Sequence, residues 1–245
     1  MAEEKKLEQE YLPEEITEKD VKKSWLTYYF FAETGISYER LQALGFCMSL
    51  IPIFKKLYKK KEDFTAALKR HMVFYNTEAV FGSVINGITI AMEEQKAKGA
   101  PIDDETITSV KSGLMGPMAG VGDSLDWATF KPIIFALGAT LSAQGSPIGC
   151  FVLLLLPIIQ MIIGTNFAAF GYRKGRSSVR SILGSGKIQQ LLTAASALGI
   201  YMMGALSSTY VKLSTPLQFT FGKRKMKPYV IQNILDGIVP GYYHY

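Results

Sequence analysis

The sequence feature that most constrains the fold of this chain is a long stretch without charge. No Asp, Glu, Lys or Arg occurs from Pro132 to Tyr172, a run of 41 residues, and a second uncharged run of 24 residues covers Ile188 to Val211. A helix crosses a bilayer with about 20 mainly apolar residues. Soluble core helices rarely stay uncharged for so long, so the sequence predicts an integral membrane protein.

Two segments are long enough to be full transmembrane helices, residues 147–171, which contain Pro157, and residues 188–211. Other apolar pieces are too short to span, and they cover residues 41–54, 79–92 and 133–143. Short segments interrupted by Gly or Pro are typical of broken helices in transporters. The predicted fold is all-α, an integral membrane protein with full transmembrane helices plus short broken, re-entrant and amphipathic helices.

Residues 62–75 show the amphipathic pattern, because Phe64, Leu68 and Tyr75 share one helical face while Lys69 and Arg70 fall elsewhere. The formal net charge is +6, and the basic residues are clustered in blocks beside the apolar segments. Such blocks favour cytoplasmic helix ends and lipid headgroups over nucleic acid, for which no motif is present.

The N-terminal residues 1–23 are highly charged and lack the apolar core of a secretory signal. We interpret them as a tail that precedes a membrane domain over residues 24–245.

The stretch MGPMAGVGDSLDW, residues 115–127, places two acids beside a tryptophan at the mouth of the uncharged run. In one interpretation Asp123 and Ser124 cap a helix, because their oxygens accept free backbone N–H groups. In the other, a carboxylate faces a polar cavity and binds a polyhydroxyl ligand, since acids within a membrane are costly and usually functional. Both roles can coexist, and Asp126 would share the face of Asp123. Trp127 either anchors at the membrane interface or stacks on a sugar ring.

The chain contains few residues of the types that catalyse reactions or bind transition metals. The sequence contains two histidines, His71 and His244, and two cysteines, Cys47 and Cys150, all in separate places. No metal cluster or nucleophilic triad is predicted from them. His71 is expected at the surface or in packing, and both cysteines are expected to be buried. The glycines of the acidic stretch do not match a nucleotide-binding pattern.

Several motifs, taken in order, resemble one family of bacterial proteins. They are SYERLQALGF, KKLYKKKEDFTAALKRHMVFYNTE, GITIAMEE, VKSGLMGPMAGVGDSLDW followed by TFKPI, and ASALGIYMMGALSSTYVKLSTPL. The chain strongly resembles the IID component of the mannose/fructose/sorbose family of phosphoenolpyruvate-dependent sugar phosphotransferase systems. The resemblance covers roughly residues 24–240.

The resemblance implies a multi-pass subunit of the bacterial inner (plasma) membrane. IID and IIC components together recognise and translocate a hexose or related sugar, while the phosphocarrier proteins IIA and IIB supply the phosphoryl group to the incoming sugar. IID is then a non-catalytic subunit that is not itself phosphorylated and needs no cofactor. The assembled complex is expected to be an oligomer of IIC–IID pairs in the lipid bilayer.

Candidate sugar-binding residues follow from the family motifs and from the chemistry of sugars, which need paired hydrogen-bonding groups and one aromatic ring. Asn76 lies in a piece that resembles the family's Phe-Asn-Thr motif, and Asp123 with Ser124 matches its Gly-Asp-Ser motif. The predicted sugar-binding residues are Asn76, Asp123, Ser124, Trp127, Gln42 and Asn86.

The chain also departs from the family pattern. Asp126 replaces a residue that is usually apolar, Lys131 replaces an arginine, and Glu78-Ala79 replaces His-Pro. The C-terminus is expected to be shortened relative to the family. Two alternatives therefore stay open: a truncated, non-transporting IID that only assembles with IIC and IIB, and a Mg²⁺-dependent membrane enzyme that uses Asp123 and Asp126.

Overall fold

The computed structural model describes residues 12–182 without a break and, beyond them, the single positions 193, 197, 201 and 204 and the strands β1 (Thr220–Phe221) and β2 (Arg224–Lys225). The chain divides into two compact units, residues 1–199 and residues 200–245. In the second unit, β1 and β2 form a short antiparallel pair. The predicted span over residues 188–211 lies outside the continuously described part.

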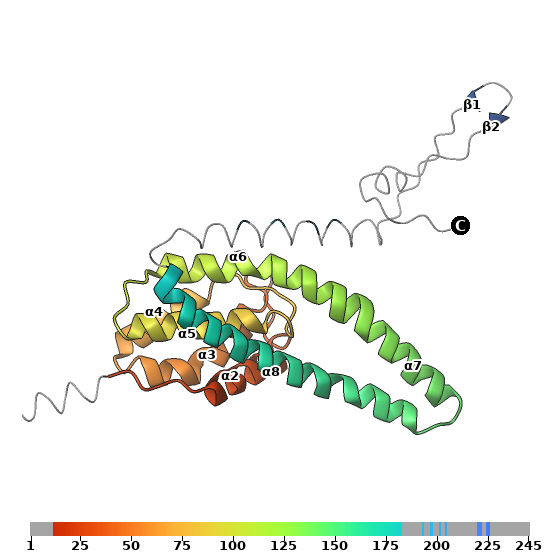
Figure 1. Cartoon of the computed structure of the whole chain (residues 1–245), viewed down its shortest axis with the longest axis horizontal. Helices are drawn as coiled ribbons and strands as arrows, with labels where there is room; N and C mark the ends of the chain where they lie inside the picture. Colours follow the sequence, from red (N-terminus) through yellow and green to blue (C-terminus); the bar gives the residue numbers. More distant parts are fainter. Residues whose placement is uncertain are drawn as a thin grey trace, which may run out of the picture. The chain divides into compact units, whose positions relative to one another are not determined.

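The first unit is helical, as predicted (Figure 1). Its elements are α2 (Glu18–Phe31), α3 (Ala43–Leu57), α4 (Lys61–His71), α5 (Ser83–Ala97), α6 (Asp104–Gly122), the π-helix η1 (Asp123–Phe130), α7 (Lys131–Ala143) and α8 (Ile148–Ile182).

Helix α2 begins inside the stretch that the sequence placed in the charged tail. Thr17 and Asp20 form a reciprocal cap: the Asp20 carboxylate accepts from Thr17 N at 2.9 Å, and Thr17 Oγ1 accepts from Asp20 N at 3.3 Å. Val21, Trp25 and Tyr28 then lie on one buried face at helical spacing. Residues 18–23 therefore belong to the folded unit.

Helices α5 and α8 pack closely because glycines line their contact. A Cβ placed on Gly87 would lie 2.5 Å from the backbone nitrogen of Tyr172, so a larger side chain would force the two helices apart. Of the small pair Ser83 and Gly87, predicted to permit a close helix contact, Gly87 does so against α8. Aromatic side chains complete the core, with the rings of Phe46 and Tyr75 centred 4.2 Å apart.

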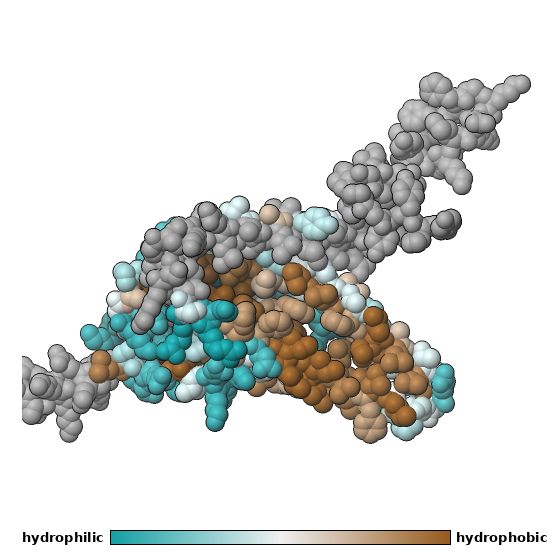
Figure 2. Space-filling model, viewed as in Figure 1, coloured by the Kyte–Doolittle hydropathy of each residue, from teal (hydrophilic) through white to brown (hydrophobic). Residues whose placement is uncertain are grey.

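Helices α7 and α8 form a long antiparallel hairpin (Figure 1), and its outer surface is apolar. Large side chains such as Phe135, Phe151 and Leu154 are exposed there, and hydrophobic residues gather over this hairpin in Figure 2. Within the described residues, Ile148–Ser177 is the one helical segment long and apolar enough to cross a membrane, and 22% of its most apolar window is buried. The outward apolar face fits a lipid environment. Cys150 is exposed on this hairpin, contrary to expectation.

A buried charge cluster connects α4 to α5. Glu93 is fully buried and accepts from Arg70 Nε at 2.8 Å, and it lies 2.7 Å from His71 Nε2. Burial alone raises the pKa of Glu93, but the hydrogen bonds and charges of His71 and Arg70 outweigh it and lower that pKa to about 2. The expectation that His71 is a surface or simple packing residue missed this cluster.

Candidate functional site

A cavity of about 300 Å³ opens between the end of α2, the loop that precedes α5, and the π-helix η1. Its walls combine carboxylates, amides and an aromatic ring. The lining residues are Tyr29, Ala32, Glu33, Gln42, Asn76, Thr77, Glu78, Ala79, Val80, Ala119, Asp123, Asp126, Trp127, Lys131 and Gln160. Four of the six predicted site residues, Gln42, Asn76, Asp123 and Trp127, are among them.

The acidic stretch lines the cavity as part of a continuous helix. Gly122 and Asp123 both have right-handed helical backbone angles, so α6 continues into η1 without a new helix start. No side-chain cap is present at that point. The capping interpretation of Asp123 is therefore wrong, because the backbone N–H groups there already lie within a helix. A π-helical turn is rare and often marks a functional site, and this one carries Asp123, Asp126 and Trp127 to the same cavity.

Asp126 is the centre of a hydrogen-bonded network on one wall. It is 3% exposed, and its Oδ1 accepts from Gln160 Nε2 at 2.7 Å. Gln160 Oε1 in turn accepts from the Tyr29 hydroxyl at 2.9 Å. The other oxygen, Oδ2, forms an ion pair with Lys131, whose Nζ lies 2.8 Å away. Among the described residues, this oxygen accepts no well-aligned hydrogen bond. Lys131 therefore pairs with a buried acid of the same wall.

Trp127 presents its ring at the cavity mouth. The side chain is 60% exposed, and the Lys131 ammonium lies 3.3 Å from the ring centre. An ammonium over an indole face is a favourable cation–π arrangement. With its side chain this exposed, the ring is available for stacking on the face that Lys131 does not cover.

Gln42 is fixed in the opposite wall by three contacts. Its Oε1 accepts from the Tyr28 hydroxyl at 2.6 Å and from Thr77 N at 3.1 Å, and its Nε2 donates to Glu33 Oε1 at 2.8 Å. Asn76 lies next to it at the exposed rim. Among the described residues, the Asn76 side-chain amide has no hydrogen-bond partner, so it can meet a ligand without breaking an internal bond.

Glu78 forms the floor between these two walls. The residue is 6% exposed, and its carboxylate accepts from Val80 N at 2.8 Å and from Phe81 N at 2.7 Å. Gly122 packs directly on its side chain: a Cβ at Gly122 would lie 2.6 Å from Glu78 Cβ. The glycine therefore permits the loop before α5 and the end of α6 to close the cavity.

The structure places two predicted residues away from the cavity. Ser124 Oγ donates to Gly120 O at 2.7 Å, one turn back along its own helix. Asn86 is fully buried on α5, where its Nδ2 lies 3.5 Å from Ser49 Oγ. Neither side chain lines the cavity.

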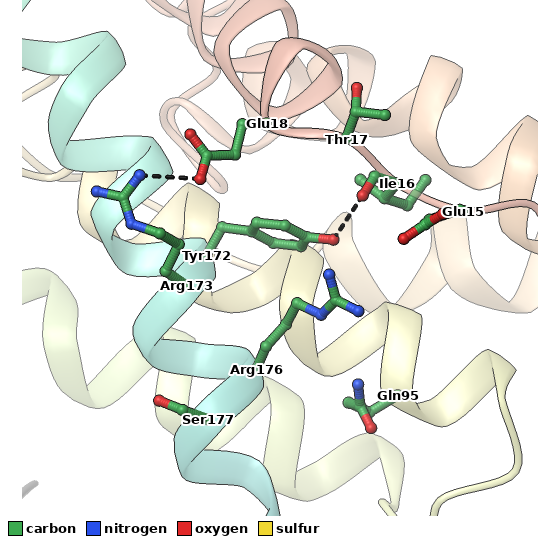
Figure 3. A pocket seen from close by; sticks show the side chains of 9 residues that line it. All are labelled: Glu15, Ile16, Thr17, Glu18, Gln95, Tyr172, Arg173, Arg176 and Ser177. Atoms are coloured by element: carbon green, nitrogen blue, oxygen red, sulfur yellow. Dashed lines mark hydrogen bonds and ion pairs between the residues drawn. The ribbon is translucent and has the colours of Figure 1, made fainter.

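A second, larger cavity of about 790 Å³ lies near the C-terminal part of α8 (Figure 3). Its polar groups mainly engage one another. Arg173 pairs with Glu18 at 2.9 Å, and the Tyr172 hydroxyl donates to Ile16 O at 2.8 Å (Figure 3). The Arg176 guanidinium covers the Tyr172 ring at 5.5 Å. The smaller cavity therefore has the better combination of an accessible ring, an unpaired amide and acids.

Comparison with known proteins decides the family. The PTS system mannose/fructose/sorbose family IID component matches residues 15–244 of the chain. This chain belongs to that IID family. The sorbose-specific EIID component of Lacticaseibacillus casei is 40% identical over 94% of this chain and 82% of its own length. The mannose-specific EIID component of Escherichia coli K12 is 38% identical over 92% of this chain and 81% of its own length.

Solved structures agree with the assignment to the IID family. The structure of the mannose transporter ManYZ in complex with a microcin matches with a TM-score of 0.77 and 37% identity, over 93% of this chain and 84% of that chain. A second structure, described as a membrane protein, matches with a TM-score of 0.62 and 36% identity. Together with the apolar hairpin, these matches establish the chain as a helical membrane protein of the phosphotransferase system.

Several cavity residues of this IID chain were not predicted as ligands. Glu78, Asp126 and Lys131 were noted in the sequence as departures from the family pattern and were not among the predicted sugar-binding residues, yet all three line the cavity. The gathering of these departures in one short part of the fold could have indicated the site. Tyr29 and Gln160 could not have been found in this way, because they meet across a sequence separation of 131 residues.

Proposed function

We propose that this chain is the IID subunit of a mannose-type sugar phosphotransferase transporter and that the cavity at η1 contacts the sugar. A IIC partner completes the translocation unit, and IIB phosphorylates the sugar as it passes. The observation that supports this proposal is the convergence of Asp123, Asn76 and Trp127, from different parts of the chain, on one cavity of about 300 Å³.

Each group has a role that fits sugar chemistry. The Asp123 carboxylate accepts hydrogen bonds from ring hydroxyls, and the Asn76 amide both donates and accepts. Trp127 packs on the apolar face of the ring. Gln42 and Gln160 are held by their own hydrogen bonds, which keeps the walls preorganised and reduces the entropy lost on binding.

The phosphoryl chemistry is assigned to other subunits. Among the described residues, His71 is fully buried against Glu93, which withholds its ring from an incoming phosphocarrier. Lys131 lies where a Mg²⁺ ion on Asp126 would have to bind. Both observations favour a transport role over an enzymatic one.

We further propose that the IID domain, which includes residues 18–23 of α2 as well as the predicted residues 24–245, lies in the bacterial plasma membrane, crosses it more than once and functions in an oligomer of IIC–IID pairs. The matches over most of the chain support a shared architecture with the relatives.

The direct test uses cells that lack their native IID subunit and retain IIA, IIB and IIC. This chain is expressed there, and phosphoenolpyruvate-dependent phosphorylation of mannose, glucose, fructose, sorbose and amino sugars is measured. Restored phosphorylation is the expected result. A chain that reaches the membrane and binds IIC without restoring phosphorylation of any sugar would instead be a IID subunit that assembles but does not transport.

The site itself is tested with Asp123→Asn, which keeps the size of the side chain and removes its charge. We expect reduced sugar phosphorylation with normal assembly. Asp63→Asn is the matched control, because Asp63 is exposed in the first turn of α4, away from the cavity. Equal activity of both variants and the unaltered chain would remove Asp123 from the sugar site.

A further inference from the structure

The loop residues 75–79, here called the rim segment, form one wall of the η1 cavity and belong to no helix. Folded elements hold this segment at both of its ends. The backbone oxygen of Tyr75 accepts from Gln42 N at 2.9 Å, and the backbone oxygen of Ala79 accepts from Trp25 Nε1 at 2.9 Å. The placement of the middle of the segment therefore depends on what holds the residues between these two anchors.

The middle of the rim segment is held between α6 and the Gln42 side chain. Thr77 N donates to Gln42 Oε1 at 3.1 Å, and Thr77 Oγ1 donates to Met115 O at 3.2 Å. The backbone N–H of Asn76 points to Met115 Sδ, 3.2 Å away. The side-chain amide of Asn76 lines the cavity and has no hydrogen-bond partner among the described residues. The segment thus uses its other polar groups to present this one amide.

Gln42 has the chemistry of a clamp rather than of a sugar ligand. The residue is 5% exposed, and its amide oxygen accepts from the Tyr28 hydroxyl as well as from Thr77 N. An amide oxygen has two lone pairs, so none remains for a sugar hydroxyl. The amide nitrogen donates to Glu33 Oε1 at 2.8 Å. A side chain that meets two donors on one side and a carboxylate on the other must be an amide.

Backbone strain directly before Gln42 is a second, independent observation. Leu41 has a φ of 45°, and among the described residues it is the one non-glycine residue with a positive φ. A bulky side chain rarely adopts this conformation, which persists where the surrounding structure enforces it and is concentrated at functional sites. Here Leu41 N donates to Ser37 O at 2.8 Å. The strained residue sets the direction in which the Gln42 side chain leaves the backbone.

We infer that Gln42 is a positioning residue of the sugar site: it makes no contact with the sugar and holds Thr77 so that the neighbouring Asn76 amide stays at the rim. This inference rests on the proposed function, and it gives Gln42 a role other than the sugar contact that the sequence predicted. Without the Gln42 amide the segment keeps its two end anchors, but its middle must be ordered when the sugar binds, and that ordering reduces affinity.

A double-mutant cycle in the complex of this chain with IIC, IIA and IIB tests the route through Asn76. KM and kcat are measured for the sugar that the unaltered complex phosphorylates best. Asn76→Ala and Gln42→Met should each raise KM by about tenfold with little change in kcat, the effect of one lost hydrogen bond. With Asn76→Ala already present, Gln42→Met should raise KM by no more than about twofold, because the amide that it positions is gone. Gln144→Met is the control, since Gln144 is exposed and does not line the cavity.

Exchange of the amide and the carboxylate tests the clamp itself. Gln42→Glu keeps an acceptor for Thr77 N but places a carboxylate against Glu33, so KM should rise. In a chain that carries Glu33→Gln, the same substitution should raise KM much less, because the amide at position 33 then donates to the carboxylate at position 42. Such recovery is not expected if the Gln42 amide itself touches the sugar. Thermal denaturation of each complex shows whether a change in KM occurs without a loss of stability.

The outcomes separate this inference from the proposed function. If the unaltered complex phosphorylates a sugar, the inference is wrong when either single variant leaves KM unchanged, or when the two factors in KM multiply in full. It is also wrong when Glu33→Gln brings no recovery, which decides the case if Gln42→Met does not assemble with IIC. In all of these cases the transport function stands. If the unaltered, assembled complex phosphorylates none of the sugars, the proposed function fails, and the inference fails with it.

Discussion

The ammonium of Lys131 lies 3.3 Å from the centre of the Trp127 ring while it pairs with Asp126 at 2.8 Å. One lysine therefore holds both the aromatic ring and the buried acid of the η1 cavity. Because Asp126 also accepts from Gln160 on α8, the contact connects the π-helix to the long helix of the hairpin. Its loss should affect stability and sugar binding together.

Lys131→Met should destabilise the protein. The substitution leaves the Asp126 carboxylate, 3% exposed, without its counter-charge, and breaking a buried pair from one side costs about 3 kcal/mol or more. The measurement is thermal denaturation of the purified IIC–IID complex. Lys131→Arg should retain most of the stability, and Lys131→Met combined with Asp126→Asn should recover part of the loss. Equal stability of Lys131→Met and the unaltered complex would show that the pair contributes nothing.

Gly122→Ala should impair the cavity. The new methyl group would lie 2.6 Å from Glu78 Cβ, so Glu78 or the end of α6 must move, and we expect sugar phosphorylation to fall several-fold. Gly116→Ala, on the same helix, is the control. Among the described residues, nothing lies within 4 Å of a Cβ at Gly116, and alanine favours a helix by about 1 kcal/mol over glycine. An unchanged phosphorylation rate in Gly122→Ala would mean that the floor of the cavity adapts freely.

Trp127→Ala should raise KM for the sugar more than it lowers kcat, because a stacking ring contributes binding energy in the ground state as well as in the transition state. Trp127→Phe should retain part of the affinity. The side chain is 60% exposed, so neither substitution should prevent folding. Steady-state phosphorylation kinetics with purified IIB measures KM and kcat for the unaltered chain and both variants. A pure kcat effect would argue against stacking.

Because of Glu93, the free energy of unfolding should fall as the pH falls through the acid range. Its pKa is lowered to about 2 in the folded chain from an ordinary value of 4.5. The unfolded chain therefore takes up this proton first as the pH falls. The stabilisation is fully present above pH 4.5 and is lost progressively toward pH 2.

Denaturation of the complex between pH 6 and pH 3 measures this loss. Glu93→Gln should lower stability at pH 6 by about 3 kcal/mol, because the buried Arg70 loses its buried partner and keeps only the exposed Asp104 carboxylate, and it should flatten the decline toward low pH. Glu62→Gln, in the first turn of α4 and exposed, is the control. A decline of equal steepness in Glu93→Gln would assign the acid sensitivity to other carboxylates.

The sequence predicted the elements whose signals are local. Hydropathy alone located α8, and Gly87 of the predicted small pair correctly indicated a close helix contact. The spacing of Phe64 and Leu68 indicated α4. These predictions succeeded because apolar periodicity reports directly on what a helix buries.

Other features depend on contacts that no local pattern contains. Arg70 was assigned to the polar side of its helix, yet Glu93, 23 residues away, draws it into the core. The capping interpretation of Asp123 followed a sound local rule that fails where one helix continues into another. Gln160 reaches Asp126 across 34 residues. Such pairs are set by tertiary packing, which overrides local preference.

The π-helix also has a consequence for how this chain tolerates change in length. An α-helix turns by about 100° per residue, so deleting one residue within Asp123–Phe130 would rotate everything that follows by roughly a quarter of a turn or more. The exposed apolar surface of α7 would then face the packed interior, and its inward side would face the lipid. The number of residues in η1 sets the rotation of α7 about its axis relative to α6. Substitutions in this segment should therefore be easier to accommodate than single-residue insertions or deletions.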